Sequence, residues 1–215
     1  MSNTIDVVGA SNINGTFNNY LDYDRFYNPN SATYLNNGSL TIPPGVYFAG
    51  DFSVSFWINF KSLNNDTSIF EFGNDGQSDI ISISVLSYPD RSVYKVMILG
   101  IDSLCSMYYN EIYAPAQIIN NKWYFIAFVL RGNTGLFYID GLNTYSNTIC
   151  SPNLVFRKIN QIGNSSNQFL LNLNGTISDF KIYNKALLSS DISVEFKQKC
   201  RFFSFIFFYL FKTII

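Results

Sequence analysis

NGTISDFKIYNKAL, residues 174–187, decides the fold of this chain. Asn174 and Gly175 predict a turn, because glycine adopts positive φ without steric cost and asparagine tolerates it. Over residues 177–183 the side chains alternate in character, which is the period of a strand with one buried face. The segment therefore predicts a turn followed directly by a half-buried strand.

A short helix is expected after this strand. Ser189, Ser190 and Asp191 offer a serine cap and an acidic first turn, so the pattern predicts a helix over residues 192–199. The other periodic segments are short, they are bounded by Gly, Asn, Asp and Pro, and no long helix interrupts them. The helix is therefore a minor element of a chain built mainly from strands.

Alternation is clearest over residues 51–60, where one parity is wholly apolar and predicts a strand with one face in the core. Residues 32–42 predict two strands joined by a turn at residues 36–38. The apolar parity of the first segment consists of Phe52, Val54, Phe56, Ile58 and Phe60.

Residues 123–130, WYFIAFVL, are apolar throughout. They are too short for a membrane span, so they predict a central strand covered on both faces. Asp140 and Gly141 follow the next apolar run and supply the positive φ of a tight hairpin turn. Together these segments predict an all-β fold, a two-sheet antiparallel β-sandwich with one short C-terminal helix.

The composition predicts a single folded domain with little charge. A chain of 215 residues fits one domain with a full two-layer core. Charged residues make up 13%, the formal net charge is −1, and no cluster of Lys or Arg is present. Because nucleic-acid binding needs a basic patch, a nucleic-acid partner is not expected. Histidine is absent, which excludes histidine-dependent nucleophiles and imidazole metal sites.

The chain divides into three regions with different sequence patterns. Residues 1–30 are Asn-rich and predict a lead-in that is mostly loop, with one edge strand near residues 5–8. Residues 31–200 carry the strand patterns of the domain. Residues 201–215, RFFSFIFFYLFKTII, hold six of the 21 phenylalanines and lie outside that pattern. A membrane span needs about 18–20 apolar residues, so the sequence predicts no membrane contact outside this tail.

Four segments, in a fixed order, carry a resemblance to known proteins. They are GDFSVSFWI at residues 50–58, NKWYFIAFVLRGNTGLFYIDG at 121–141, QIGNSS at 161–166 and NGTISDFKIYNKALLSSDI at 174–192. In this order and at these intervals they resemble the laminin G-like branch of the concanavalin A-like lectin and glucanase jelly rolls. The resemblance runs over roughly residues 33–199 and implies two antiparallel sheets packed face to face.

The resemblance also implies a function. Such domains recognise carbohydrate, glycolipid or protein outside cells, often as one module of an adhesive chain. An extracellular location is therefore implied, although the first residues lack the basic start and apolar run of a secretory signal. The expected function is a non-catalytic lectin-like module for a carbohydrate, glycoprotein or protein partner. The alternative is a structural or protein-interaction domain without a sugar site.

Calcium is the cofactor that the resemblance implies. Many relatives hold a structural calcium through backbone carbonyls near the first strands and an acidic pair in the last strand, and here that pair reads Ser178 and Asp179. Asp179 is thus a candidate metal ligand, and Asp51, expected near the sheet rim, is a second. The alternative is that Asp179 fixes strand register and that Asp51 caps a turn.

A glycosidase is the competing interpretation, because glucanases share this architecture and use two carboxylates. Their E-x-D-x-x-E motif places its acids on one strand face, and it is absent here. The nearest acids are Glu71 and Asp75, and the Gly-Asn pair between them predicts a turn. The sequence therefore predicts no catalytic residues.

Ligand contacts are expected in rim loops, namely residues 64–66, 74–78 and 164–168. Trp57 and Trp123 have rings that could stack on a sugar, but tryptophans on sandwich strands more often belong to the core.

Cys105, Cys150 and Cys200 form an odd set without CxxC spacing, which indicates neither a zinc site nor a dense disulfide framework. In an oxidising compartment the preferred disulfide joins Cys105 to Cys150. The alternative is a set of buried free thiols.

Overall fold

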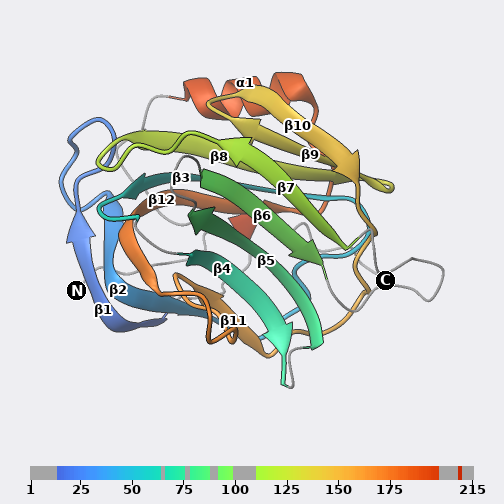
Figure 1. Ribbon diagram of the computed structural model, residues 1–215, viewed down its shortest axis with the longest axis horizontal. Helices are drawn as coiled ribbons and strands as arrows, with labels where there is room; N and C mark the ends of the chain where they lie inside the picture. Colours follow the sequence, from blue (N-terminus) through green and yellow to red (C-terminus); the bar gives the residue numbers. More distant parts are fainter. Residues whose placement is uncertain are drawn as a thin grey trace.

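The computed structural model describes residues 14–63, 66–75, 78–87, 92–98, 110–198 and 208–209. Within them the chain forms strands and one helix (Figure 1). The elements are β1 (Asn14–Asp22), β2 (Ala32–Ile42), β3 (Phe52–Phe60), β4 (Thr67–Asn74), β5 (Ser78–Ser87), β6 (Ser92–Ile98), β7 (Glu111–Ala116), β8 (Trp123–Arg131), β9 (Thr134–Ile139), β10 (Leu142–Thr148), β11 (Ile159–Ile162), β12 (Leu173–Tyr183), α1 (Ser189–Lys197) and β13 (Phe208–Tyr209).

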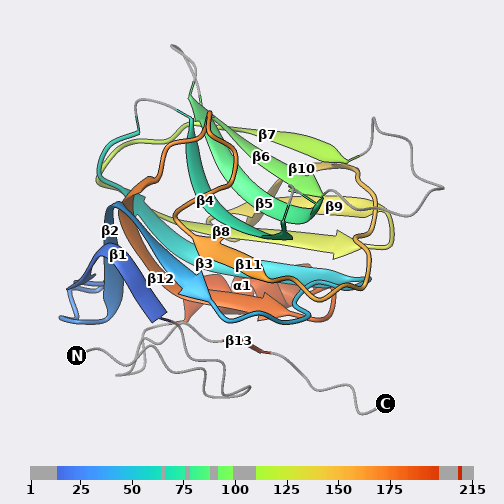
Figure 2. The same ribbon diagram turned by 90° about the horizontal axis from the view of Figure 1, so that it is seen from below.

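The strands form one folded antiparallel sheet that makes two layers. Its hydrogen-bonded path runs β10-β9-β8-β3-β12-β2-β11-β4-β5-β6-β7, and β1 pairs with β2 off this path. Figure 2 shows β4, β5, β6 and β7 in one layer, and β8, β3, β12 and β2 in the other. The two ends of the path, β7 and β10, lie against each other. The predicted all-β sandwich with a short helix is confirmed.

The main core fills the space between the layers. Every residue of β3 is buried, and its predicted apolar face lies in this core. The other face of β3 and β8 packs on α1 through a second cluster that contains Trp57, Phe125 and Ile192. β8 contributes side chains to both clusters, so the prediction of a central strand covered on both faces is confirmed.

The turn chemistry of the β9–β10 hairpin is also as predicted. Asp140 and Gly141 join the two strands with φ values of 51° and 78°. The Asp140 carboxylate additionally accepts a hydrogen bond from the main-chain N–H of Phe125 at 2.9 Å. This side-chain contact fixes the hairpin turn against β8.

Two predicted turns are wrong. Residues 36–38 lie inside the continuous strand β2, where Asn37 takes a φ of 50° and β12 pairs alongside. Asn174 and Gly175 lie inside β12. A Cβ atom on Gly175 would lie 2.7 Å from the carbonyl oxygen of Asn59, so the glycine serves the close approach of β12 to β3.

The helix begins three residues earlier than predicted and has a different cap. α1 starts at Ser189, and its N-cap is Leu188 rather than a serine. The Asp191 carboxylate accepts a hydrogen bond from the main-chain N–H of Leu188 at 3.0 Å. Asp191, in the acidic first turn, therefore accepts the hydrogen bond that caps the start of the helix.

The two ends of the chain add short strands. The lead-in was predicted to be mostly loop, but residues 14–22 form β1, because backbone pairing with β2 is available there despite the irregular side-chain pattern. The edge strand predicted near residues 5–8 lies outside the described residues. From the tail, Phe208 and Tyr209 pair in parallel with β12. Among the described residues no helix is long and apolar enough to span a membrane.

Tyr94, on β6, carries a polar atom into the core. Its ring is fully buried and packs on Phe137, with ring centroids 5.1 Å apart. Its hydroxyl has no hydrogen-bond partner among the described residues. Burial, assisted by the nearby Tyr124 and Asp140, raises the pKa of Tyr94 well above its ordinary value of 10.0, so the hydroxyl is neutral at physiological pH.

We expect Tyr94→Phe to leave the free energy of unfolding unchanged, or to raise it by up to about 1 kcal/mol, because it removes a buried hydroxyl that nothing compensates. Urea denaturation measures the change. The matched control is Tyr138→Phe, since the Tyr138 hydroxyl lies 3.0 Å from Ser189 Oγ; its loss should cost about 1 kcal/mol. A destabilisation of Tyr94→Phe as large as that of Tyr138→Phe would contradict this expectation.

Candidate functional site

The most distinctive rim of the sandwich is the loop of residues 23–31 between β1 and β2, which we call the aromatic loop. Its backbone is organised from within by the buried side chain of Asp24. One carboxylate oxygen accepts hydrogen bonds from the main-chain N–H groups of Phe26 at 2.8 Å and Asn28 at 2.9 Å. The other oxygen accepts one from the Asn28 side chain at 2.9 Å. A loop held in this way keeps one conformation.

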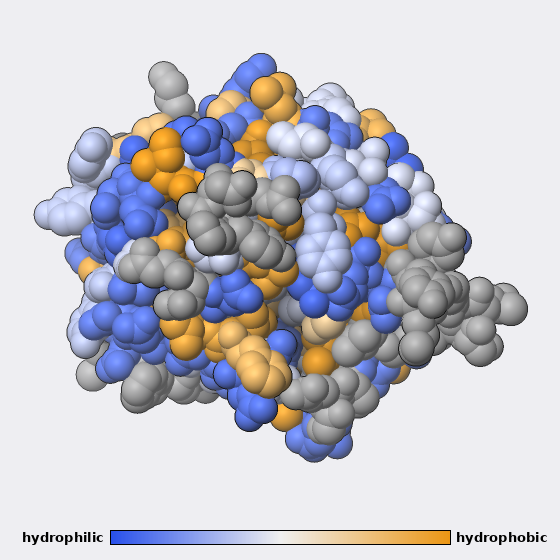
Figure 3. All heavy atoms as spheres, viewed as in Figure 1, coloured by the Kyte–Doolittle hydropathy of each residue, from blue (hydrophilic) through white to orange (hydrophobic). Residues whose placement is uncertain are grey.

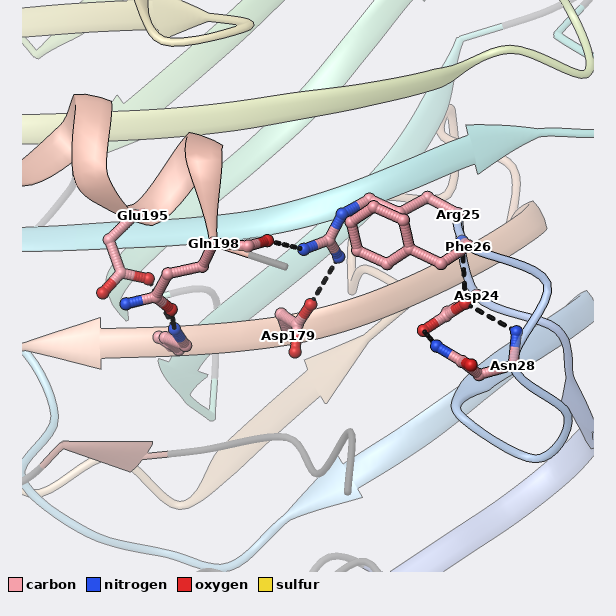
Figure 4. A network of polar contacts seen from close by, with 8 residues as sticks. Asp24, Arg25, Phe26, Asn28, Asp179, Glu195 and Gln198 are labelled. Atoms are coloured by element: carbon pink, nitrogen blue, oxygen red, sulfur yellow. Dashed lines mark hydrogen bonds and ion pairs between the residues drawn. The ribbon is translucent and has the colours of Figure 1, made fainter. Parts of the chain in front are cut away.

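A β-bulge in β12 lies beside this loop. The pairing with β3 shifts register between Ser178 and Lys181, and Asp179 takes a φ of 51°. Ile177 and Phe180 therefore both reach the main core, three positions apart. The extra residue of the bulge directs the Asp179 carboxylate toward the aromatic loop, as Figure 4 shows.

Arg25 joins the aromatic loop to β12 and α1. Its Nη1 lies 2.7 Å from Asp179 Oδ2, and its Nη2 donates to the carbonyl oxygen of Gln198 at 2.9 Å (Figure 4). Its guanidinium carbon lies 4.1 Å from the ring centroid of Trp57 and 4.5 Å from that of Phe26. The exposed side-chain fractions of Arg25 and Asp179 are only 7% and 18%, so the pair is largely shielded from water.

Further polar contacts complete the rim. Lys181 Nζ lies 2.5 Å from Glu195 Oε2, so a second ion pair joins β12 to α1. The Thr176 hydroxyl donates to the Asp22 carboxylate at 2.7 Å, which joins β12 to the end of β1. Each charge of the two ion pairs therefore has an opposite charge beside it.

Three aromatic side chains of the aromatic loop are exposed to solvent. The residues Tyr23, Phe26 and Tyr27 are 56%, 44% and 85% exposed. Tyr27 also has a φ of 64°, in the left-handed region that costs a residue with a Cβ about 1–2 kcal/mol. The bulky ring of Tyr27 is thus exposed to solvent, and its backbone has a conformation that suits glycine or asparagine.

The two predicted metal ligands lie apart. The register places Asp179 near the middle of β3, whereas Asp51 directly precedes that strand, about five residues or 17 Å away. The Asp51 carboxylate accepts a hydrogen bond from the main-chain N–H of Gly132 at 2.6 Å. No group of three or more acidic, cysteine or histidine side chains is placed to hold a metal within the described ranges. A calcium ion held by these two residues together does not fit, and calcium at either one stays a prediction.

The two glutamates of the β4–β7 layer lie on strands that are not neighbours. The register runs from Glu71 to Ser82, from Ser82 to Met97 and from Met97 to Glu111, so their backbone positions are three strand spacings or about 14 Å apart. Glu71 is also occupied, because Ser165 and Ser166 donate hydrogen bonds to its carboxylate.

The outer face of this layer pairs its own charges. Lys95 Nζ lies 2.8 Å from Glu111 Oε1, and the Tyr113 hydroxyl donates to Glu111 at 2.6 Å. Burial alone would raise the pKa of Glu111, but the hydrogen bonds and the charge of Lys95 outweigh it, and the pKa is lowered. Figure 3 shows this side of the molecule, where hydrophilic and hydrophobic residues are intermixed on the surface.

The tryptophans and cysteines singled out from the sequence are the remaining candidates. Trp57 is buried under α1, which confirms its core interpretation, and Trp123 is partly buried and packs at the edge of the same cluster. Cys150 is buried and disulfide-bonded, so it is not a free thiol. Cys105 and Cys200 lie outside the described residues, and the pairing of Cys105 with Cys150 stays a prediction.

Sequence reasoning missed the aromatic loop. The loops proposed for ligand contact were residues 64–66 and 74–78, each only partly described, and 164–168, which the Glu71 contacts hold against β4. The available signal was three aromatic residues within five positions, at residues 23–27, beside two possible anchoring charges. The sequence alone does not show what these charges contact, so it predicts only a lead-in that is mostly loop.

Comparison with known proteins places the fold of this chain in a wider group. A family model described as the concanavalin A-like lectin/glucanases superfamily matches residues 35–193. No curated protein sequence matches the chain. Similar solved structures include domain 4 of AbnA, a GH43 extracellular arabinanase from Geobacillus stearothermophilus, in complex with arabinotriose. It is 18% identical, with a TM-score of 0.59 and coverage of 89% of either chain.

Two further structures have the same fold. A heptameric SAP-like pentraxin from Limulus polyphemus is 14% identical with a TM-score of 0.58, over 72% of this chain and 73% of its own. The binding domain of botulinum neurotoxin DC, in complex with rat synaptotagmin II, is 18% identical with a TM-score of 0.62. That match covers 87% of this chain but only 46% of the neurotoxin domain. At these identities the likeness concerns the fold alone.

Proposed function

We infer that this chain, which belongs to the concanavalin A-like lectin/glucanases superfamily, is a non-catalytic recognition module that binds carbohydrate through its aromatic loop. The observation that carries this proposal is Tyr27. Its ring is 85% exposed, and its left-handed backbone conformation is unfavourable for a bulky residue. A side chain that adds little to packing and strains the backbone is retained most simply for contact with a ligand.

The chemistry of the loop favours a sugar. Exposed aromatic rings offer flat apolar faces for the CH groups of a pyranose or furanose ring, and the tyrosine hydroxyls can bond its oxygens. Tyr23 and Phe26 precede Tyr27 in the same loop and are also exposed. Because Asp24 and Arg25 fix the loop from below, little conformational entropy is lost when a ligand binds.

The surroundings of the two glutamates of the β4–β7 layer support a binding role. The backbone positions of Glu71 and Glu111 are about 14 Å apart, and both carboxylates are engaged, Glu71 by two serines and Glu111 by Lys95. Domain 4 of the arabinanase was solved with arabinotriose, so this fold has presented a surface to a sugar in another protein. A protein partner is the alternative, and the neurotoxin binding domain was solved with synaptotagmin II.

Tyr27→Asn should separate binding from stability. Asparagine tolerates the left-handed conformation, so the free energy of unfolding should stay unchanged or rise by up to about 1 kcal/mol. Affinity for any glycan that the wild type binds on an array should fall at least about tenfold, the size of a lost aromatic contact. Thermal denaturation and titration of the best array ligand measure the two effects.

Phe169→Asn is the matched control, because Phe169 is 79% exposed on the different loop between β11 and β12. This variant should keep wild-type affinity. An array without any bound glycan, in calcium and in chelator, would favour the protein-interaction alternative. Equal affinity of wild type and Tyr27→Asn for a bound glycan would show that the aromatic loop is not the contact.

A further inference from the structure

We propose that Arg25 is the structural cation of this rim: its guanidinium compensates the Asp179 carboxylate and connects three elements, so no divalent ion is needed there. The inference goes beyond the proposed function, because it concerns the assembly of the site and holds whatever ligand the aromatic loop binds. It starts from the 2.7 Å contact between Arg25 Nη1 and Asp179 Oδ2.

The residues at the bulge do not fit calcium. The resemblance implies an acidic pair, but the first member is Ser178, whose hydroxyl is buried and without a partner among the described residues. The second member, Asp179, already binds Arg25. Calcium takes six to eight oxygen ligands and depends on carboxylates among them, so one shared carboxylate with a neutral hydroxyl is a poor set.

The neighbouring carboxylates of the rim are already engaged and cannot readily complete such a set. Asp22 accepts the Thr176 hydroxyl at 2.7 Å. Asp24 accepts three hydrogen bonds within the aromatic loop. Recruiting Asp24 to an ion would break the contacts that shape the loop, and recruiting Asp22 would break the contact between β1 and β12.

The charges on this face already balance. Arg25 is opposed by Asp179, and Lys181 by Glu195. A divalent cation would bring two further positive charges into a region that is largely shielded from water, where like charges repel strongly. Removing Arg25 would have the opposite effect and leave the Asp179 carboxylate shielded and unpaired.

Arg25 also makes the connections that a bound ion would make. One nitrogen contacts the β12 bulge, and another donates to the carbonyl oxygen of Gln198, the C-cap of α1. That helix end carries partial negative charge, which favours a cation. The guanidinium face packs on Trp57 of β3. A flat guanidinium provides directed donors and a stacking surface, which a spherical ion cannot.

Thermal denaturation of the full chain, in millimolar calcium chloride and in excess EDTA, tests the proposal. The wild type should show the same Tm in both solutions. Arg25→Met should lower the Tm by roughly 5–10 °C, because it leaves a shielded carboxylate unpaired. Arg25→Met/Asp179→Asn should recover part of this loss, since no uncompensated charge then remains. Lys185→Ser, which removes an exposed lysine close to β12, is the control and should leave the Tm unchanged.

A second variant looks for the ion directly. Arg25→Ser/Ser178→Asp removes the internal cation and restores the acidic pair, so its Tm should rise by several degrees in calcium and fall back in EDTA. The absence of that rise would contradict the equivalence of Arg25 and an ion. The proposal would also be overturned by a calcium-dependent rise of the wild-type Tm that Asp179→Asn abolishes, or by an Arg25→Met variant as stable as the wild type.

Discussion

Arg157→Ala is expected to lower the free energy of unfolding by about 4–5 kcal/mol, a value near the top of the range for single substitutions. Arg157 is fully buried. Its guanidinium donates to the carbonyl oxygens of Asp79 at 2.8 Å, Phe48 at 3.1 Å and Asn153 at 3.5 Å. Truncation leaves these carbonyls without their donor, at about 1–3 kcal/mol for a buried group, and opens a cavity as well.

The charge of Arg157 persists in this setting. Burial lowers the pKa of Arg157 to about 10, against an opposing effect of Asp79, so the guanidinium is protonated at neutral pH. Carbonyl dipoles, rather than a carboxylate contact, surround it. Arg157→Lys keeps the charge with fewer directed donors, and it should recover only part of the lost stability.

Urea denaturation of Arg157→Ala measures the loss. Lys158→Ala is the matched control, because it removes the neighbouring exposed cation and should change stability by less than about 0.5 kcal/mol. A loss below about 2 kcal/mol for Arg157→Ala would mean that the three carbonyls find other donors.

Gly163→Ala is expected to cost at least about 3 kcal/mol. Gly163 has a φ of 87°, and a Cβ there would lie 2.6 Å from the carbonyl oxygen of Gly38 and 2.7 Å from Leu35 Cδ1. The left-handed conformation costs about 1–2 kcal/mol, and the collision with backbone adds to it because β2 cannot move without disturbing β12.

Gly132→Ala isolates the conformational part of this cost. Gly132 has a φ of 54°, and a Cβ added there would meet no atom of the described residues within 4 Å, so the substitution should cost only about 1–2 kcal/mol. The difference between the two variants, measured by urea denaturation, reports the collision. Equal losses of stability in the two variants would show that β2 can move at Gly38 without a loss of folding free energy.

The strands of the core could be predicted because their evidence is local. The alternation over residues 51–60 and the apolar run at 123–130 follow from the need to bury one face or two. The hairpin turn at Asp140 and Gly141 could be predicted because it needs positive φ values, which these residue types adopt. The turn predictions at residues 36–38 and 174–175 failed because asparagine and glycine also occur in bulges and at close strand contacts.

The candidate site could not be predicted in the same way. Arg25 and Asp179 are 154 positions apart, and nothing in either neighbourhood indicates the other. Arg157 stands in the sequence FRKIN, which has the polarity of a surface segment, but its side chain is fully buried among carbonyls of three distinct segments. Such contacts depend on the complete fold, whereas periodicity and turn chemistry describe only a few neighbouring residues.

The long reach of Arg25 has a consequence for biosynthesis. Its partners, Asp179 and Gln198, lie 154 and 173 positions further along the chain, so the loop leaves the ribosome long before Arg25 can contact either of them. A nascent or proteolytically shortened chain that lacks β12 and α1 would still contain every aromatic residue of the loop. It would lack the two contacts by which Arg25 joins the loop to β12 and α1. Recognition that depends on this attachment would thus require that the last strand and the helix have been made and folded.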